Sequence, residues 1–179
     1  NDELVADVTH SHKLYETKHS IAYQIQEEIF QTTGIVTTVG MGPNQLMAKL
    51  ALDNAAKVSA PWFAYWRYED IPETIWQIPK LTDFWSIGHK TAAKLERMGI
   101  HSVYELAHAN RQQLKRQFGV LGDAMYFHSW GISYQGLTQR YVPRAASRGY
   151  GYSQVPSTAY VMRGDIETRL LVLLHTVAT

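Results

Sequence analysis

The stretch FWSIGHKTAAKLERMGI, from Phe84 to Ile100, places a glycine-bearing turn directly before a basic helix. A helix N-terminus leaves backbone amides unpaired and carries partial positive charge. Gly88 lets an anion approach these amides closely, and Lys90 and Lys94 add positive charge for the same phosphate strand. The segment Ile87-Gly88-His89-Lys90 therefore predicts a helix-hairpin-helix unit that contacts nucleic-acid backbone without reading bases.

A second hairpin is predicted about thirty residues later, at Gly119-Val120-Leu121-Gly122, before a helix from Asp123 to Trp130. Arg111, Lys115 and Arg116 supply positive charge there. A single glycine-containing turn between helices is usually only a corner, whereas two such turns flanked by basic residues favour binding to DNA backbone.

The first part of the chain alternates strand and helix signals. Ile21, Ile25 and Ile29 recur every four residues, which predicts a helix over Lys18 to Thr33 that stops at Gly34. Asn44 is suited to cap a helix that runs through Lys57. Strands are predicted over Leu4 to Thr9, Ile35 to Gly40 and part of Val58 to Ile71, so this part reads as a piece of an α/β sheet.

The remainder is predicted to be mainly helical. Pro72 and Pro79 bracket a short helix, and the pattern from Leu81 to Ile132 consists of short helices separated by glycines. Further along, a linker is predicted from Gln135 to Ala146, a strand from Tyr150 to Val155, and a helix from Asp165 to Val177.

Composition excludes several classes of protein. The 179 residues contain no cysteine, which excludes disulfides and cysteine-based zinc sites. No run of eighteen apolar residues and no signal peptide occur, so no membrane partner is expected and the cytoplasm is the default compartment. Five basic and ten acidic residues precede Trp76, and twelve basic and six acidic residues follow Ile75, which suggests an acidic part and a basic part with different partners. Scatter between solvated faces is the alternative.

Several motifs together resemble Y-family DNA polymerases, the lesion-bypass enzymes, and are most similar to the UmuC-like, ImpB/MucB/SamB group. The opening NDELVADVT resembles the Ser-x-Asp-Glu strand motif of the family's palm. TVGMGPNQLMAKLALDNAAK, Thr38 to Lys57, is similar to its strand, turn and helix with Ala-Lys-x-Ala-x-Asp spacing. The stretches IWQIPKLTDFWSIGHKTAAKLERMGI and FGVLGDAMYFHSWGI resemble the thumb, and SRGYGYSQVPSTAY resembles the first strand of the little finger.

The resemblance implies a multi-domain α+β fold. It consists of a partial α/β palm (residues 1–75), an all-α thumb with tandem helix-hairpin-helix motifs (76–134), a linker (135–147), and an incomplete α/β little-finger start (148–179). The little finger has one strand and one helix here, where the family has four strands and two helices. Its apolar face is therefore expected to lack a partner, with a swapped dimer as one outcome.

The resemblance also implies the site residues. Asp2 and Glu3 would be two of three catalytic carboxylates, which in the family bind two Mg²⁺ ions. Lys57 would neutralise the incoming dNTP, although many relatives have that lysine one position earlier, at Ala56 here. Arg144 and Arg148 would join the hairpin residues Ile87, Gly88, His89, Lys90, Lys94, Gly119 and Gly122 in contacting DNA.

The implied function belongs to a longer protein: error-prone translesion synthesis on a primer–template in DNA repair and the SOS response, with a sliding clamp as a candidate partner. The family's first catalytic aspartate and its fingers have no counterpart in this sequence, so the chain itself is expected to be inactive. Two alternatives stay open. One is a non-catalytic DNA-backbone-binding module with tandem hairpins from another repair protein, and the other is a protein-interaction domain.

Overall fold

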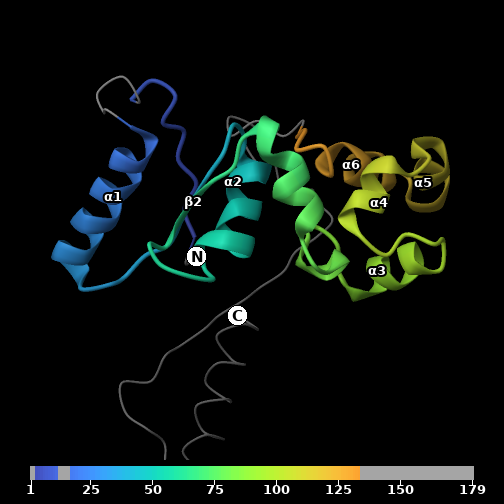
Figure 1. Ribbon diagram of the computed structural model, residues 1–179, viewed down its shortest axis with the longest axis horizontal. Helices are drawn as coiled ribbons and strands as arrows, with labels where there is room; N and C mark the ends of the chain where they lie inside the picture. Colours follow the sequence, from blue (N-terminus) through green and yellow to red (C-terminus); the bar gives the residue numbers. More distant parts are fainter. Residues whose placement is uncertain (1–2, 12–16, 134–179) are drawn as a thin grey trace, which may run out of the picture. The chain divides into compact units, whose positions relative to one another are not determined.

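The computed structural model of the protein describes residues 3–11 and 17–133 (Figure 1). The chain divides into two compact units, Asn1–Gln139 and Arg140–Thr179, and the described residues all belong to the first. Within these residues, no helix combines the length and the apolar character that crossing a bilayer requires. The predicted residues and segments that lie outside the described ranges are Asp2, Arg144, Arg148, the linker from Gln135, and the little-finger strand and helix.

Helix α1, Lys18–Thr33, has the predicted limits because both of its ends carry capping residues. The Thr17 hydroxyl accepts a hydrogen bond from the Ser20 amide at 3.0 Å. Gly34 adopts a left-handed conformation (φ 72°), and its amide donates to the Phe30 carbonyl at 2.7 Å. Ile21 and Ala22 are buried, whereas Ile25 is 42% exposed, so only part of the apolar stripe is covered.

The sheet is smaller than the sequence predicts. Strand β1, Val39–Met41, pairs in parallel with β2, Phe63–Tyr65, and Gly40 lies opposite Ala64. The predicted strand over Ile35 to Gly40 is therefore correct only at its end, and the predicted strand over Leu4 to Thr9 is wrong because the described residues there make no ladder. A β-branched or alternating run becomes a strand only where a neighbouring strand pairs with it.

One long helical segment connects the two strands. Helix α2, Gln45–Ala51, continues without a break into a π-helical turn, Leu52–Ala56. Asn44 caps it as predicted, accepting from the Met47 amide at 2.9 Å. The helix lies close against β1, since a Cβ on Gly40 would stand 2.2 Å from the Ala48 carbonyl oxygen.

The rest of the described chain is helical, as predicted, and it begins with three 3₁₀ turns. The helix expected between Pro72 and Pro79 is the second of these turns. These turns are Tyr68–Glu73, Ile75–Gln77 and Leu81–Asp83. Four short α-helices follow: α3, His89–Glu96; α4, Val103–His108; α5, Arg111–Phe118; and α6, Val120–His128.

A single hydrophobic core contains residues from both sides of the predicted boundary at residue 75. Leu46 and Leu50 from α2 belong to the same cluster as Phe84, Leu106 and Leu114 from the helical part, and each is at most 1% exposed. The described residues on the two sides of this boundary are thus packed together within one unit. Burial of apolar surface is the dominant favourable term in such packing.

Gly122 provides a test of the packing between α5 and α6. A Cβ on Gly122 would stand 2.1 Å from the Leu114 carbonyl oxygen, whereas a Cβ on Gly88 would meet nothing within 4 Å. We expect Gly122→Ala to lower the free energy of unfolding by roughly 1–3 kcal/mol through overpacking, measured by urea denaturation. The control Gly88→Ala should lower the free energy of unfolding by less than about 1 kcal/mol, because it only exchanges glycine for alanine as the N-cap residue of α3. Equal stability of the two variants would contradict the close approach of α5 to α6.

Candidate functional site

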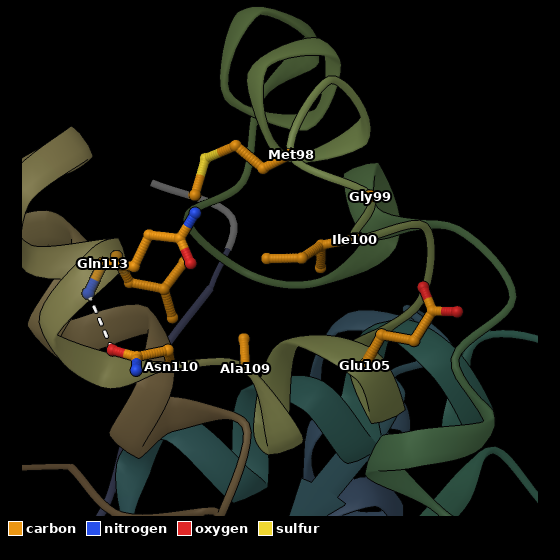
Figure 2. A pocket seen from close by; sticks show the side chains of 8 residues that line it. Met98, Gly99, Ile100, Glu105, Ala109, Asn110 and Gln113 are labelled. Carbon is orange, nitrogen blue, oxygen red and sulfur yellow. Dashed lines mark hydrogen bonds between the residues drawn. The ribbon is translucent and has the colours of Figure 1, made fainter.

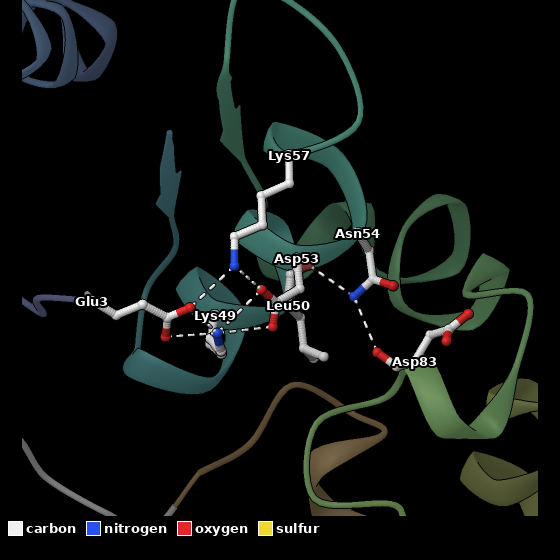
Figure 3. Close-up of polar contacts among 7 residues, drawn as sticks. All are labelled: Glu3, Lys49, Leu50, Asp53, Asn54, Lys57 and Asp83. Atoms are coloured by element: carbon white, nitrogen blue, oxygen red, sulfur yellow. Dashed lines mark hydrogen bonds and ion pairs between the residues drawn. The ribbon is translucent and has the colours of Figure 1, made fainter. Parts of the chain in front are cut away.

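Glu3 lies within reach of two lysines from the α2 segment (Figure 3). The Lys49 ammonium contacts both carboxylate oxygens of Glu3, at 2.6 and 2.7 Å. The Lys57 ammonium lies 3.1 Å from Glu3 Oε1 and 2.8 Å from Asp53 Oδ1. Asp53 Oδ1 also accepts a hydrogen bond from the Lys49 ammonium at 3.1 Å. Two carboxylates and two ammonium groups therefore form one network.

The helix brings three of these groups together because Lys49, Asp53 and Lys57 are spaced by four residues, which places them on one face. The structure brings together Glu3 and Lys57, two residues that the sequence predicts for the site. Lys49 and Asp53 were not among the predicted residues. The repeated four-residue spacing of opposite charges was the signal that could have identified them.

The network shifts the pKa values of Glu3, Lys49 and Lys57. Hydrogen bonds from Lys49 and then Lys57 hold the pKa of Glu3 below its ordinary value. Burial lowers the pKa of Lys49, but hydrogen bonds to Glu3 and Asp53 outweigh this effect, so its pKa is raised overall. Hydrogen bonds to Asp53 and Glu3 raise the pKa of Lys57. Glu3, Lys49 and Lys57 are therefore charged at neutral pH.

The described part of this site does not fit a magnesium ion. Both oxygens of Glu3 contact an ammonium group, and among the described residues no three metal-ligating side chains come together. Magnesium is usually bound by carboxylate oxygens and water in a near-octahedral arrangement. In this structure Glu3 is the ion-pair partner of two lysines.

The first hairpin has the features that the sequence analysis expected of an anion site, except that a 3₁₀ turn, Leu81–Asp83, stands in place of its first helix. Gly88 caps α3, and its carbonyl accepts from the Thr91 and Ala92 amides, both at 3.0 Å. The preceding amides, of His89 and Lys90, thus come before the first hydrogen bond of the helix. Both of these side chains are exposed, and the described residues offer neither of them a hydrogen-bond or ion-pair partner.

Two other predicted residues of the first hairpin point elsewhere. The Ile87 side chain is 4% exposed and belongs to the core, so only its backbone is available to a ligand. Lys94 is half-buried and donates a hydrogen bond to the main-chain oxygen of Gln117 at the end of α5.

The second hairpin differs from the predicted one in where its helix begins. α6 starts at Val120, directly after Gly119, so Gly122 lies inside the helix and not in the turn. Gly119 has a φ of 64° and therefore requires glycine, while Gly122 permits the close approach of α5. The Arg111 guanidinium contacts Asp123 at 2.6 Å and lies over the Phe127 ring at 4.4 Å, so part of the predicted positive charge is neutralised.

A cavity of about 220 Å³ lies between the turn after α3 and the start of α5 (Figure 2). Two of its polar groups serve as helix caps. Glu105 accepts from the Ser102 amide at 3.2 Å, and Asn110 accepts from the Gln113 amide at 3.0 Å. The cavity is lined by Met98, Gly99, Ile100, Glu105, Ala109, Asn110, Gln113 and Leu114. We assign it no ligand.

Comparison with known proteins gives two family matches. The impB/mucB/samB family model matches residues 1–53, and the model of the helix-hairpin-helix motif of the IMS family matches residues 68–100. The second match includes the first hairpin and ends before the second.

Three relatives illustrate the similarity. The chain is 35% identical over 158 residues to the DNA repair protein homolog YobH of Bacillus subtilis. This match covers 88% of the chain and 72% of YobH. It is 33% identical over 163 residues to the putative UV-damage repair protein UvrX of the same species, covering 91% of the chain and 39% of UvrX. It is 28% identical over 176 residues to DNA polymerase IV 2 of Halalkalibacterium halodurans, covering 98% of the chain and 42% of that protein.

A solved structure shows a similar fold. DinB from Sulfolobus solfataricus superposes with a TM-score of 0.57 at 20% sequence identity, over 74% of this chain and 38% of DinB. The chain thus spans about two fifths of the length of UvrX, of this DNA polymerase IV and of DinB.

The ion pairs of Glu3 predict a defined titration behaviour. Replacing Lys49 by Met should raise the pKa of Glu3 towards its ordinary value, because the first of its two hydrogen-bonding lysines is lost. Any stability that the ion pair contributes should be present at neutral pH and should disappear as the pH falls through the lowered pKa of Glu3. The measurement is an NMR titration of the Glu3 side-chain carboxyl carbon. Exposed Lys80 supplies the control Lys80→Met, and a Glu3 titration that is identical in both variants would contradict the network.

Proposed function

The chain belongs to the impB/mucB/samB family of Y-family DNA polymerases, and on this premise we propose that it is part of an error-prone translesion DNA polymerase. The proposed reaction is template-directed transfer of a nucleotide to a primer 3′-hydroxyl on damaged DNA. The observation that supports this most directly is the network of Glu3 with Lys49 and Lys57. Two ammonium groups side by side supply the positive charge that binding of a triphosphate requires.

The triphosphate contact is assigned to Lys57 in this proposal. Its side chain is 43% exposed and that of Lys49 is 22% exposed, so Lys57 is the more accessible of the two ammonium groups. Lys49 lies closer to Glu3 and holds both of its oxygens. A dNTP would therefore meet Lys57 first, while Lys49 keeps the Glu3 carboxylate in place.

DNA binding is assigned to the hairpins. The unpaired amides of His89 and Lys90 and the exposed Lys90 side chain suit a phosphate of either strand. Exposed Lys115 and Arg116 supply charge beside the second hairpin, where the Arg111 charge is shared with Asp123. Such contacts contribute affinity without sequence preference and weaken with salt.

The finer features are proposed for the longer protein. They comprise two Mg²⁺ ions with Asp2 and Glu3 among their ligands, DNA contacts from Arg144 and Arg148, a sliding clamp as partner, a role in the SOS response, and action in the cytoplasm. The described residues by themselves do not build the magnesium site. We therefore expect the 179-residue chain alone not to extend a primer.

A non-catalytic DNA-backbone-binding module is the second candidate. It is favoured by one observation: both oxygens of Glu3 are already bound by Lys49 in the structure. A module of this kind would bind duplex DNA through its hairpins and would show no polymerase activity in any longer form of the protein.

Binding to a primer–template duplex across a salt series, followed by fluorescence anisotropy, tests the assignment of the hairpins. We expect the logarithm of the association constant to fall linearly with the logarithm of salt concentration, irrespective of sequence. Gly88→Ala should weaken binding roughly tenfold or more, because its methyl group would stand where a phosphate approaches the free amides. The control Gly34→Asn keeps a left-handed helix cap on α1 and should bind like the wild type. Normal binding by Gly88→Ala would exclude this hairpin as the phosphate site.

Primer extension by the full-length gene product separates the two candidate functions. If the protein is a polymerase, Glu3→Gln should reduce the extension rate by about 10²-fold or more, since metal-assisted charge stabilisation contributes several kcal/mol. The exposed Glu96 has no described ion-pair partner, so Glu96→Gln is the matched control and should retain activity. Extension that is unaffected by Glu3→Gln would remove Glu3 from the catalytic site, and absence of extension by the wild type would favour the binding module.

A further inference from the structure

The Lys94 side chain extends from α3 to the end of α5. Its ammonium donates a hydrogen bond to the main-chain oxygen of Gln117 and lies 4.5 Å from the centre of the Phe118 ring. Lys90, one turn earlier on α3, is exposed and has no such contact among the described residues. The two lysines of the first hairpin therefore differ in what they contact, although the sequence places them on one helix face.

The position of the Lys94 ammonium is favourable for two independent reasons. The last carbonyl groups of a helix lack amide partners within the helix and carry partial negative charge, and Gln117 lies in the last turn of α5. The face of an aromatic ring attracts a cation, and Phe118 is the final residue of the same helix. One of the three N–H donors of the Lys94 ammonium is thus committed to Gln117, and the Phe118 ring covers part of the group.

The two helices joined by Lys94 are the ones that adjoin the hairpins. α3 follows the first hairpin at Gly88, and α5 ends at Gly119, the turn of the second hairpin. The core beneath them contains Leu95 from α3 and Leu114 from α5. Lys94 thus links α3 to α5 above the core that they share, through a contact between residues 23 positions apart in the sequence. We call this contact the strut.

We propose that Lys94 is a positioning residue that fixes the first hairpin relative to the second, and that Lys90 is the lysine of this pair that contacts DNA phosphate. The inference rests on the proposed DNA binding by the hairpins and assigns different roles to its two lysines. A duplex presents phosphates at fixed spacing, so two hairpins held at a constant separation bind it together with less ordering cost.

The salt dependence of binding distinguishes a phosphate contact from a strut. The 179-residue chain and its variants Lys90→Met, Lys94→Met and Lys94→Arg are compared by anisotropy with a primer–template duplex and by thermal unfolding. Lys90→Met should make the plot of log association constant against log salt shallower by about 0.9, the value for one lost phosphate contact, without changing the unfolding temperature. Lys94→Met should give a line parallel to the wild type but displaced to weaker binding, and should lower the unfolding temperature by about 2–4 °C.

Lys94→Arg should restore both properties, because a guanidinium also donates to a carbonyl and stacks on an aromatic ring. A slope that is shallower by about 0.9 in Lys94→Met would make Lys94 a phosphate contact and overturn the inference. An unchanged unfolding temperature, or a binding line that coincides with the wild type, would also overturn it.

Failure of the proposed function has a different signature. If the wild-type chain does not bind the duplex at low salt, the assignment of the hairpins to DNA fails, and the DNA role of Lys94 fails with it. The unfolding temperatures of Lys94→Met and Lys94→Arg require no DNA and decide separately whether the strut between α3 and α5 exists.

Discussion

The side chain of Asn44 connects the two parts of the described structure. Its carbonyl oxygen accepts from the Met47 amide at 2.9 Å and so starts α2. Its amide group donates to the Gly131 carbonyl at 2.7 Å and to the Tyr68 hydroxyl at 3.0 Å. One residue thereby caps the helix that carries the lysine network and holds the chain that leaves α6. Close packing completes the junction, since a Cβ on Gly131 would stand 2.9 Å from the Met47 sulfur.

The sequence predicted the elements whose ends depend on local chemistry. Lys18–Thr33 has its predicted limits because Thr17 and Gly34 satisfy the helix ends with their own groups. The strands were predicted less well because pairing depends on a distant partner. Of the predicted strand from Ile35 to Gly40, only Val39 and Gly40 pair, and their partners lie more than twenty residues further along the chain. The predicted boundary at residue 75 did not indicate that the described residues on its two sides share one hydrophobic core.

The site shows the same division between local and distant information. Spacing alone placed Lys90 and Lys94 together, but the carbonyl that Lys94 contacts comes from another helix and no pattern in α3 indicates it. Gly88 and Gly122 look alike in the sequence, yet space around Gly88 is open while Gly122 lies against the backbone of α5. Glu3 and Lys57 were identified through family resemblance. The four-residue spacing indicates the ion pair of Lys49 with Asp53, but only the fold shows that Lys49 also contacts Glu3.

The π-helical turn at Leu52–Ala56 has a consequence for the position of Lys57. In the turn the Lys57 amide donates to the Leu52 carbonyl five residues earlier, at 3.0 Å, so the loop holds one residue more than an α-helical turn. Because the helical segment ends at Ala56, Lys57 leaves it through this wider turn and not through a regular α-helical one. The wider turn thereby sets the direction from which the Lys57 ammonium reaches Glu3 and Asp53.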